Sequence, residues 1–315
     1  MKIGYIGLGK MGKNMVLRLL EQGIEVVAFN RSVQPLEEVA SAGAIKANSL
    51  DDLVSKLEPP RIIWLMLTAG DVVEEHINKL SEILSEEDLI IDGGNSFYKD
   101  TIRRAEQLKK KGINFMDIGT SGGPNGARVG ACLMIGGKRK DFERIKDLLE
   151  KIAAKDAYGY FGKSGAGHFV KMVHNGIEYG MMEAIAEGAA ILKASEFNLD
   201  LGEIFRVYQN RSVIESRLVG WLLEALSEDP NLENISSEIK SSGEGEWTVK
   251  SAKEMGIDIP VIEDSLKVRE ESLELTKKME GFRNESASHP LSSLAFRNKA
   301  VSAMRGKFGQ HSVKK

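Results

Sequence analysis

The chain has 315 residues, of which 42% are hydrophobic and 28% charged, and its formal net charge is −3. This length allows two domains with cores of their own, and the balanced charge gives no electrostatic basis for binding nucleic acid or an anionic membrane. No apolar run approaches the roughly 20 residues that span a bilayer, so we expect no membrane segment. Cys132 is the only cysteine and the chain begins directly on a strand pattern, two features that favour the cytoplasm. Cys132 lies in an apolar stretch and is expected to pack rather than to react. The five histidines lack a metal-ligand spacing, so we expect no metal site.

A glycine-rich loop follows the first predicted strand. Residues 2–6 form a short apolar strand pattern, residues 14–22 a helical pattern and residues 25–29 a second strand. A GxGxxG motif between the first strand and the helix is typical of dinucleotide binding, because its glycines permit a tight turn and a close approach of the backbone to pyrophosphate. A plain turn with incidental glycines is the alternative. The residues expected to bind the cofactor here are Gly7, Leu8, Gly9, Met11 and Gly12.

The end of the second strand bears on the choice of cofactor. Enzymes that use NAD usually place an acidic residue there to bind the ribose 2′-hydroxyl. This chain has Asn30, Arg31 and Ser32 instead. An arginine beside a hydroxyl can bind a 2′-phosphate, which favours NADP, although a surface arginine is the alternative and NAD stays open.

Strand and helix patterns continue to alternate through the first half of the chain. The strands are expected at 61–67, 88–92, 113–118, 131–135 and 157–161, with helices at 35–41, 71–84, 99–111 and 141–153. This alternation predicts an α/β Rossmann-type domain over residues 1–163, with a doubly wound and largely parallel sheet.

Three loops are expected at the carboxyl ends of these strands, where such sheets bind ligands. The first contains Leu67, Thr68 and Ala69, and the second contains Asn95; both are expected to contact the cofactor. The third contains Gly119, Ser121, Gly122 and Gly123, and the small donors and bare backbone amides of the second and third loops favour a site beside the cofactor. Ordinary turn chemistry is the alternative for the last two loops.

The stretch 165–180, GAGHFVKMVHNGIEYG, is the most informative part of the sequence. As a helix it places Lys171, His174, Asn175 and Glu178 at i, i+3, i+4 and i+7, so that these side chains can converge on one ligand. A solvated helix face would normally carry interchangeable Glu, Lys, Gln and Arg, and would not need the neighbouring glycines. We therefore expect this helix to form the floor of an active site.

After this helix the strand patterns stop. Helical patterns follow at 201–207, 214–226, 248–255, 261–279 and 290–305. They predict an all-α domain over residues 164–300, followed by a C-terminal tail at 301–315.

Several of these motifs together resemble the 6-phosphogluconate dehydrogenase family, which decarboxylates its substrate. The resemblance rests on GLGKMGKN, AFNRS, IIDGGNS, SGGPNGAR and GAGHFVKMVHNGIEYG, which occur in the family's order, and on a terminal R-x5-H at Arg305 and His311. At 315 residues the chain is similar to the short form of the family.

The resemblance implies a role for each matched residue. Lys171 would be the general base and Glu178 the general acid. The implied substrate-binding residues are Asn95, Ser121, Gly122, Gly123, His174, Asn175, Tyr179, Arg269, Arg305 and His311. The resemblance also implies a homodimer, or a dimer of dimers, in which the tail with Arg305 and His311 completes the partner's site.

The chain departs from the long form at one motif. Where long-form members carry Lys and Thr before the Trp-Thr pair, this chain has Ser242 and Glu244. This change removes a cation expected at the substrate phosphate, and short-form relatives often prefer NAD.

The implied activity is oxidative decarboxylation of 6-phosphogluconate to ribulose 5-phosphate and CO2 in the pentose phosphate pathway, with reduction of NADP or NAD. A lysine that loses part of its hydration against glycines is suited to take the hydroxyl proton near neutral pH. A 3-hydroxyacid dehydrogenase, for example of 3-hydroxyisobutyrate, is the alternative within the same architecture. A catalytically silent nucleotide-binding sensor or scaffold is the alternative of another class.

Overall fold

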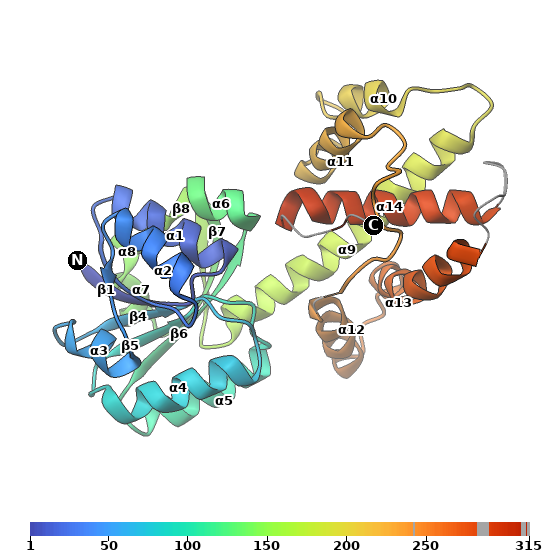
Figure 1. The fold of residues 1–315 in the computed structure, drawn as a ribbon. Coiled ribbons are helices and arrows are strands. Elements are labelled where there is room, and N and C mark those ends of the chain that lie inside the picture. The colour runs from blue at the N-terminus through green and yellow to red at the C-terminus, as the bar shows by residue number, and fades with distance from the viewer. Residues whose placement is uncertain (242, 282–289, 310–312, 314–315) are drawn as a thin grey trace. The chain divides into compact units, whose positions relative to one another are not determined.

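The computed structural model describes residues 1–241, 243–281, 290–309 and 313. The chain divides into two compact units, Met1–Val173 and His174–Lys315. The long helix α9 (Ala166–Ala194) begins in the first unit and continues into the second. Figure 1 shows the sheet and its helices in the first unit and helices alone in the described part of the second.

The first unit contains an eight-stranded sheet in the order β3-β2-β1-β4-β5-β6-β7-β8. Neighbouring strands are parallel except for the pair β6 and β7, which is antiparallel. The predicted doubly wound, largely parallel sheet is therefore confirmed. Its strands are β1 (Lys2–Ile6), β2 (Glu25–Phe29), β3 (Ile45–Lys46), β4 (Ile62–Leu65), β5 (Leu89–Asp92), β6 (Asn114–Ser121), β7 (Ala131–Gly137) and β8 (Ala153–Gly162).

Helices cover both faces of this sheet (Figure 1). One buried cluster joins the sheet to side chains of α1, α2, α6, α7 and α8, and a second cluster joins the opposite face to α3, α4 and α5. Their bounds are α1 (Lys10–Glu21), α2 (Val33–Ser41), α3 (Leu50–Ser55), α4 (Asp71–Ile83), α5 (Tyr98–Lys109), α6 (Gly123–Val129), α7 (Arg139–Arg144) and α8 (Lys146–Ile152).

In the described part of the second unit the secondary-structure elements are helices, as predicted. After α9 it contains α10 (Leu201–Tyr208), α11 (Arg217–Glu228), α12 (Glu244–Met255), α13 (Pro260–Gly281) and α14 (Pro290–Gly309). Asp200 and Ser216 accept backbone N–H groups at the starts of α10 and α11, which explains why these helices begin there. Side chains of α9, α10, α11 and α14 share one core that includes Phe205 and Met304.

Two expectations differ from the structure. Residues 301–309 lie within α14 rather than in a tail, because Val301 to Met304 are buried in the helical core and extend the helix. Cys132 is exposed, although its neighbours Ala131 and Leu133 are buried, because alternate residues of strand β7 face opposite sides. In the part of the chain that the structure describes, no helix has the length and apolarity needed to cross a membrane.

Candidate active site

The loop between β1 and α1 is built for close backbone contact. Gly7 has a φ of +98°, and a Cβ there would collide with the backbone oxygen of Met66. A Cβ on Gly12 would collide with the carbonyl oxygen of Gly7, so α1 can approach the loop only because position 12 is glycine. A Cβ on Gly9, in contrast, would meet no described atom within 4 Å. Among the described residues no side chain caps the start of α1. The loop therefore presents backbone on an open side, which is what a diphosphate requires.

The carboxyl end of β2 supports this loop. The Asn30 side chain accepts the Leu8 N–H through Oδ1 at 2.9 Å and donates to the Ser32 carbonyl oxygen at 2.9 Å. Leu8 is buried and Met11 half-buried, whereas Arg31 and Ser32 are exposed at the strand end. Asn30 thus fixes the loop, and Arg31 and Ser32 offer a cation and a hydroxyl beside it.

The next three parallel strands end at the same edge of the sheet. Leu67 and Ala69 are half-buried after β4, Thr68 is exposed, and Asn95 is half-buried after β5. Beyond β6, Gly122 and Gly123 have φ values of +120° and +64°, which only glycine adopts readily. Ser121 is the last residue of β6 itself. The predicted cofactor and substrate loops are therefore neighbours along this edge.

The start of α9 is anchored to β6 and β7. Asp117, fully buried in β6, accepts the backbone N–H groups of Gly165 at 2.8 Å and His168 at 2.9 Å. A carboxylate at a helix N-terminus satisfies unpaired amides and interacts favourably with the helix dipole. A Cβ on Gly167 would lie 2.7 Å from both the Asp117 carbonyl oxygen and the Gly136 nitrogen. Glycines on both elements thus bring the helix directly onto the sheet.

Lys171 lies one turn further along this anchored segment. It is only 4% exposed, and a Cβ on Gly119 of β6 would lie 2.8 Å from its Cγ and closer still to its Cβ. The strand, predicted to end at residue 118, continues through Gly119, whose missing side chain makes room for the lysine. His168, 1% exposed, contacts the Thr101 hydroxyl through Nδ1 at 2.7 Å. The Lys171 amine is therefore held by a stem packed against β6.

The helical unit holds the other polar residues of α9. His174 Nδ1 lies 3.1 Å from Asn175 Oδ1 and 3.8 Å from Glu178 Oε2. Asn175 is 7% exposed and the Glu178 side chain 16% exposed. These three side chains form one polar group at the start of the second unit.

Tyr179 and Arg269 form the most buried cation site in this group. The guanidinium of Arg269, a residue 3% exposed, lies 3.3 Å from the centre of the Tyr179 ring. Its Nη2 contacts the sulfur of Met182 at 3.6 Å, and its Nε and Nη1 have no hydrogen-bond partner among the described residues. Burial lowers the pKa of Arg269 to about 10. A Cβ on Gly245 of α12 would lie 2.5 Å from Cε2 of the Tyr179 ring, so glycine is needed for α12 to approach.

Arg305 of α14 belongs to the same group. Burial lowers the pKa of Arg305, while Tyr179, Glu244 and Glu178 raise it. The charge of Arg305 also contributes to the lowered pKa of Arg269. The buried Arg269 and the half-buried Arg305 therefore repel each other. The predicted residue His311 and the substituted position Ser242 lie outside the described residues.

The predicted residues fall into two sets. The first unit brings together the nucleotide loop, the strand-end loops and Lys171, and the second brings together His174, Asn175, Glu178, Tyr179, Arg269 and Arg305. The sequence reasoning missed Asp117 and Gly119. The available signals were an acidic residue inside the otherwise apolar strand pattern at 113–118 and a glycine immediately after that pattern.

Comparisons with known proteins identify the family. Residues 2–162 match the NAD-binding domain of 6-phosphogluconate dehydrogenase, and residues 167–305 match the C-terminal domain of that enzyme. A putative 6-phosphogluconate dehydrogenase of Bacillus subtilis is 41% identical over 315 residues and the whole of both chains. An NAD(+)-dependent, decarboxylating 6-phosphogluconate dehydrogenase of Haloferax volcanii is 40% identical over 85% of this chain and 90% of its own.

Solved structures of related enzymes also have the fold of this chain. The 6-phosphogluconate dehydrogenase of Plasmodium falciparum has a TM-score of 0.81 at 32% identity; the match covers 91% of this chain and 65% of that one. A 3-hydroxyisobutyrate dehydrogenase of Mycobacterium tuberculosis shares the fold, with a TM-score of 0.70 at 18% identity over 93% of this chain and 97% of its own. Both family models match this chain, and the Bacillus subtilis relative matches it over the whole of both chains. Together with the polar row of α9 they lead to one conclusion: the chain belongs to the 6-phosphogluconate dehydrogenase family.

Proposed function

We propose that this chain oxidatively decarboxylates 6-phosphogluconate to ribulose 5-phosphate and CO2 with a nicotinamide cofactor. The observation that carries the proposal within the family is the buried guanidinium of Arg269. It lies against the Tyr179 ring, and two of its nitrogens have no hydrogen-bond partner among the described residues. The half-buried cation Arg305 also acts on it electrostatically. Buried cations without enough acceptors are costly unless an anion binds them, and a phosphate provides several acceptor oxygens.

The nucleotide loop supports binding of the cofactor. The open side of Gly9 suits the diphosphate, and Arg31 with Ser32 suits a 2′-phosphate, so NADP is favoured and NAD is the alternative. A nicotinamide bound by these residues would supply the hydride acceptor for oxidation of the substrate. Leu67, Thr68, Ala69 and Asn95 are the further residues proposed to contact the cofactor.

Lys171 and Glu178 are proposed to move the protons. Lys171, packed against Gly119, would take the proton of the substrate hydroxyl and then donate a hydrogen bond to the ketone that forms. Because this ketone is β to the carboxylate, it can accept the electrons released as CO2 leaves. Glu178 would then protonate the carbon of the resulting enediol. Asn95, Ser121, Gly122, Gly123, His174 and Asn175 are proposed to bind the sugar acid.

A direct assay tests the proposal. Purified protein mixed with 6-phosphogluconate and NADP or NAD should increase the absorbance at 340 nm and release CO2 in equal amounts. 3-Hydroxyisobutyrate and unphosphorylated gluconate are the matched comparison substrates. Turnover of 3-hydroxyisobutyrate without turnover of 6-phosphogluconate would favour the 3-hydroxyacid alternative, and no turnover with any acid would favour a silent nucleotide-binding protein.

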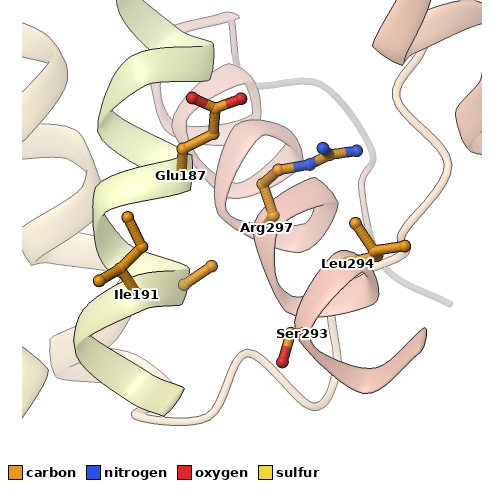
Figure 2. A pocket seen from close by; sticks show the side chains of 6 residues that line it. Glu187, Ile191, Ser293, Leu294 and Arg297 are labelled. Atoms are coloured by element: carbon orange, nitrogen blue, oxygen red, sulfur yellow. The ribbon is translucent and has the colours of Figure 1, made fainter. Parts of the chain in front are cut away.

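We further propose a cytoplasmic homodimer. Ile177, Met181 and Ile191, on one face of α9, are 52%, 42% and 72% exposed. Ile191 also lines a largely apolar groove of about 500 Å³ between α9 and α14 (Figure 2). Figure 2 shows Leu294 and Arg297 of α14 across from Ile191. Packing of this face on a second copy would bury apolar side chains that are exposed in one chain.

The partner contribution of Arg305 and His311 is a separate question. The electrostatic coupling of Arg305 to Tyr179 and Arg269 of its own chain favours a role in its own site, whereas His311 keeps the proposed role in the partner's site. Subunit mixing decides for each residue. Lys171→Met chains are unfolded and refolded together with either Arg305→Ala or His311→Ala chains. We expect the first mixture to stay inactive and the second to regain about a quarter of the activity, from one complete site in each mixed dimer.

A further inference from the structure

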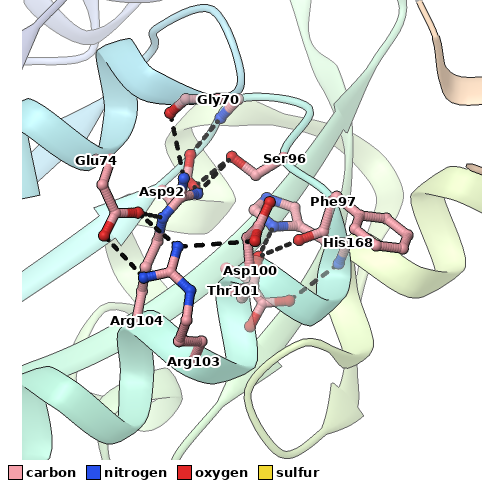
Figure 3. Close-up of polar contacts among 12 residues, drawn as sticks. Gly70, Glu74, Asp92, Ser96, Phe97, Asp100, Thr101, Arg103, Arg104 and His168 are labelled. Atoms are coloured by element: carbon pink, nitrogen blue, oxygen red, sulfur yellow. Dashed lines mark hydrogen bonds and ion pairs between the residues drawn. The ribbon is translucent and has the colours of Figure 1, made fainter.

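Arg104 of α5 is a buried cation at the edge of the sheet where the proposed cofactor and substrate loops begin. It is 1% exposed and carries no role in the reaction proposed above. Its guanidinium contacts two separate loops, both of which precede it in the chain, by 8 residues at Ser96 and by 34 residues at Gly70. Figure 3 shows these contacts together.

The first set of contacts is to the loop after β4. Nη2 donates to the Gly70 carbonyl oxygen at 3.2 Å, and Nε donates to Glu74 Oε2 at 2.8 Å. Gly70 precedes α4 with a φ of +96°, and Glu74 lies in the first turn of α4. Arg104 thus binds the end of the loop that contains Leu67, Thr68 and Ala69.

The second set of contacts is to the loop after β5. Nη1 donates to Ser96 Oγ at 3.4 Å and lies 3.8 Å from Asp92 Oδ2. Ser96 Oγ donates to the same carboxylate at 2.6 Å, and Asp92 Oδ1 accepts the Gly94 N–H at 3.2 Å. Residues on both sides of Asn95 are therefore fixed to a buried carboxylate whose counter-charge is Arg104.

The two loops also touch directly. A Cβ on Gly94 would lie 2.8 Å from the carbonyl oxygen of Leu67, so the loops approach closely only because position 94 is glycine. A close contact of this kind transmits a displacement of one loop to the other. The planar guanidinium, with donors pointing in several directions, can hold both loops at once in a way that a lysine cannot.

We propose that Arg104 is a positioning residue that fixes the cofactor loop at 67–70 relative to the substrate loop at 93–96. The inference rests on the proposed function, which assigns Leu67–Ala69 to the cofactor and Asn95 to the substrate. Hydride transfer requires the two reacting carbons in contact at the correct angle, and a displacement of about 1 Å can cost about 100-fold in rate. Arg104 touches neither ligand and acts through the two loops.

Arg103 provides a matched control on the adjacent residue. It donates to both oxygens of Glu74, at 2.8 and 2.7 Å, but its side chain is 45% exposed and none of its described contacts involves Gly70, Ser96 or Asp92. Arg103→Gln therefore removes a cation from Glu74 without releasing either loop. Arg104→Lys keeps the buried charge but cannot make the contacts to Gly70, Glu74 and Ser96 together, and Arg104→Gln removes the charge as well.

The first readout is turnover of 6-phosphogluconate. Arg104→Lys should reduce kcat by about 10- to 100-fold, whereas Arg103→Gln should stay within about 2-fold of wild type. With substrate deuterated at the carbon that loses hydride, the isotope effect on kcat should rise in Arg104→Lys alone, because misalignment slows the chemical step. Arg104→Lys with wild-type kcat and an unchanged isotope effect would overturn the proposal.

The second readout is independent of turnover. The Kd for NADPH, measured by its fluorescence, should increase by about 5-fold in Arg104→Lys and Arg104→Gln, the loss expected for one displaced hydrogen-bonded loop. An unchanged Kd in both would also overturn the proposal. If Arg104→Gln does not fold, Arg104→Lys alone decides. Inactive wild-type protein that still binds NADPH would contradict the proposed function, and the Kd comparison would still test the loop contacts.

Discussion

The close contact between Gly119 and Lys171 gives the sharpest test of how the proposed base is held. In Gly119→Ala the added methyl group would lie 2.8 Å from Lys171 Cγ and 3.2 Å from the Gly167 carbonyl oxygen. Carbon atoms in favourable contact lie about 3.5–4.0 Å apart, so Lys171 must move by about 1 Å. The helix around it cannot easily yield, because Asp117 binds Gly165 and His168 at its start.

The expected result is a large loss of kcat with a smaller loss of stability. A displacement of about 1 Å at a catalytic group corresponds to about 100-fold in rate. The additional methyl group should also lower the free energy of unfolding by about 1–3 kcal/mol, as overpacking usually does. Steady-state kinetics with 6-phosphogluconate measure the first quantity and urea unfolding the second. The Kd for NADPH should stay near the wild-type value, because the nucleotide loop is on other strands.

Gly126→Ala is the matched control. Its Cβ would meet the Ser121 carbonyl oxygen at 3.7 Å, an ordinary contact, so kcat should change by no more than about 3-fold. If Gly119→Ala is folded and turns over as fast as Gly126→Ala, the packing of Gly119 against the lysine does not position the base.

Three further predictions concern single charged groups. Lys171→Met should lower kcat by at least about 1,000-fold while leaving the Kd for NADPH nearly unchanged, and near wild-type turnover would remove Lys171 from the mechanism. Arg31→Ala should weaken NADP binding much more than NAD binding, because only NADP carries the 2′-phosphate; equal losses in titrations with the two cofactors would mean that Arg31 does not contact this group. Hydrogen bonds from Arg103 chiefly, and from Arg104, lower the pKa of Glu74 to about 2 from an ordinary value of 4.5. Glu74 therefore stabilises the fold fully above about pH 4.5 and loses this contribution as the pH falls towards 2. The difference in unfolding free energy between wild type and Glu74→Gln should shrink over that range. A constant difference would contradict the assignment of these hydrogen bonds to Glu74.

Local sequence patterns predicted the architecture well. The GxGxxG loop, the alternation of strands and helices and the later run of helices each depend on spacing within about 20 residues, which the sequence displays directly. The patterns missed β3, which has two residues, α3, which has six, and α6, whose glycines and proline are typical of a turn. They also merged α7 and α8 into one helix, although Ile145 ends the first of them.

The sequence predicted the polar row of α9 but not its surroundings. Periodicity separates two arcs of a helix without indicating which arc faces the protein. In the structure the arc with Lys171 and Asn175 is buried, at 4% and 7% exposed, whereas Ile177 of the apolar arc is 52% exposed. Contacts between residues distant in sequence could not be predicted either. Nothing in the sequence near Arg104 indicates its contact with Gly70, and nothing near Tyr179 indicates its contact with Arg269. Such contacts depend on the tertiary fold.

The two Arg269 nitrogens that have no hydrogen-bond partner among the described residues have a consequence for selectivity among sugar acids. Suppose that the buried donors of a pocket can be satisfied only by one group of the ligand. A ligand without that group leaves the donors unpaired, and the free-energy cost is then much larger than the loss of one hydrogen bond. Gluconate differs from 6-phosphogluconate only in lacking the phosphate, and should therefore be discriminated against by about 10⁴-fold in kcat/KM. Arg269→Met would remove the donors along with the charge. It should reduce the ratio of kcat/KM for 6-phosphogluconate to kcat/KM for gluconate, mainly by lowering kcat/KM for the phosphorylated acid. A cell that contains both acids would then need no separate mechanism to keep the unphosphorylated one out of this reaction.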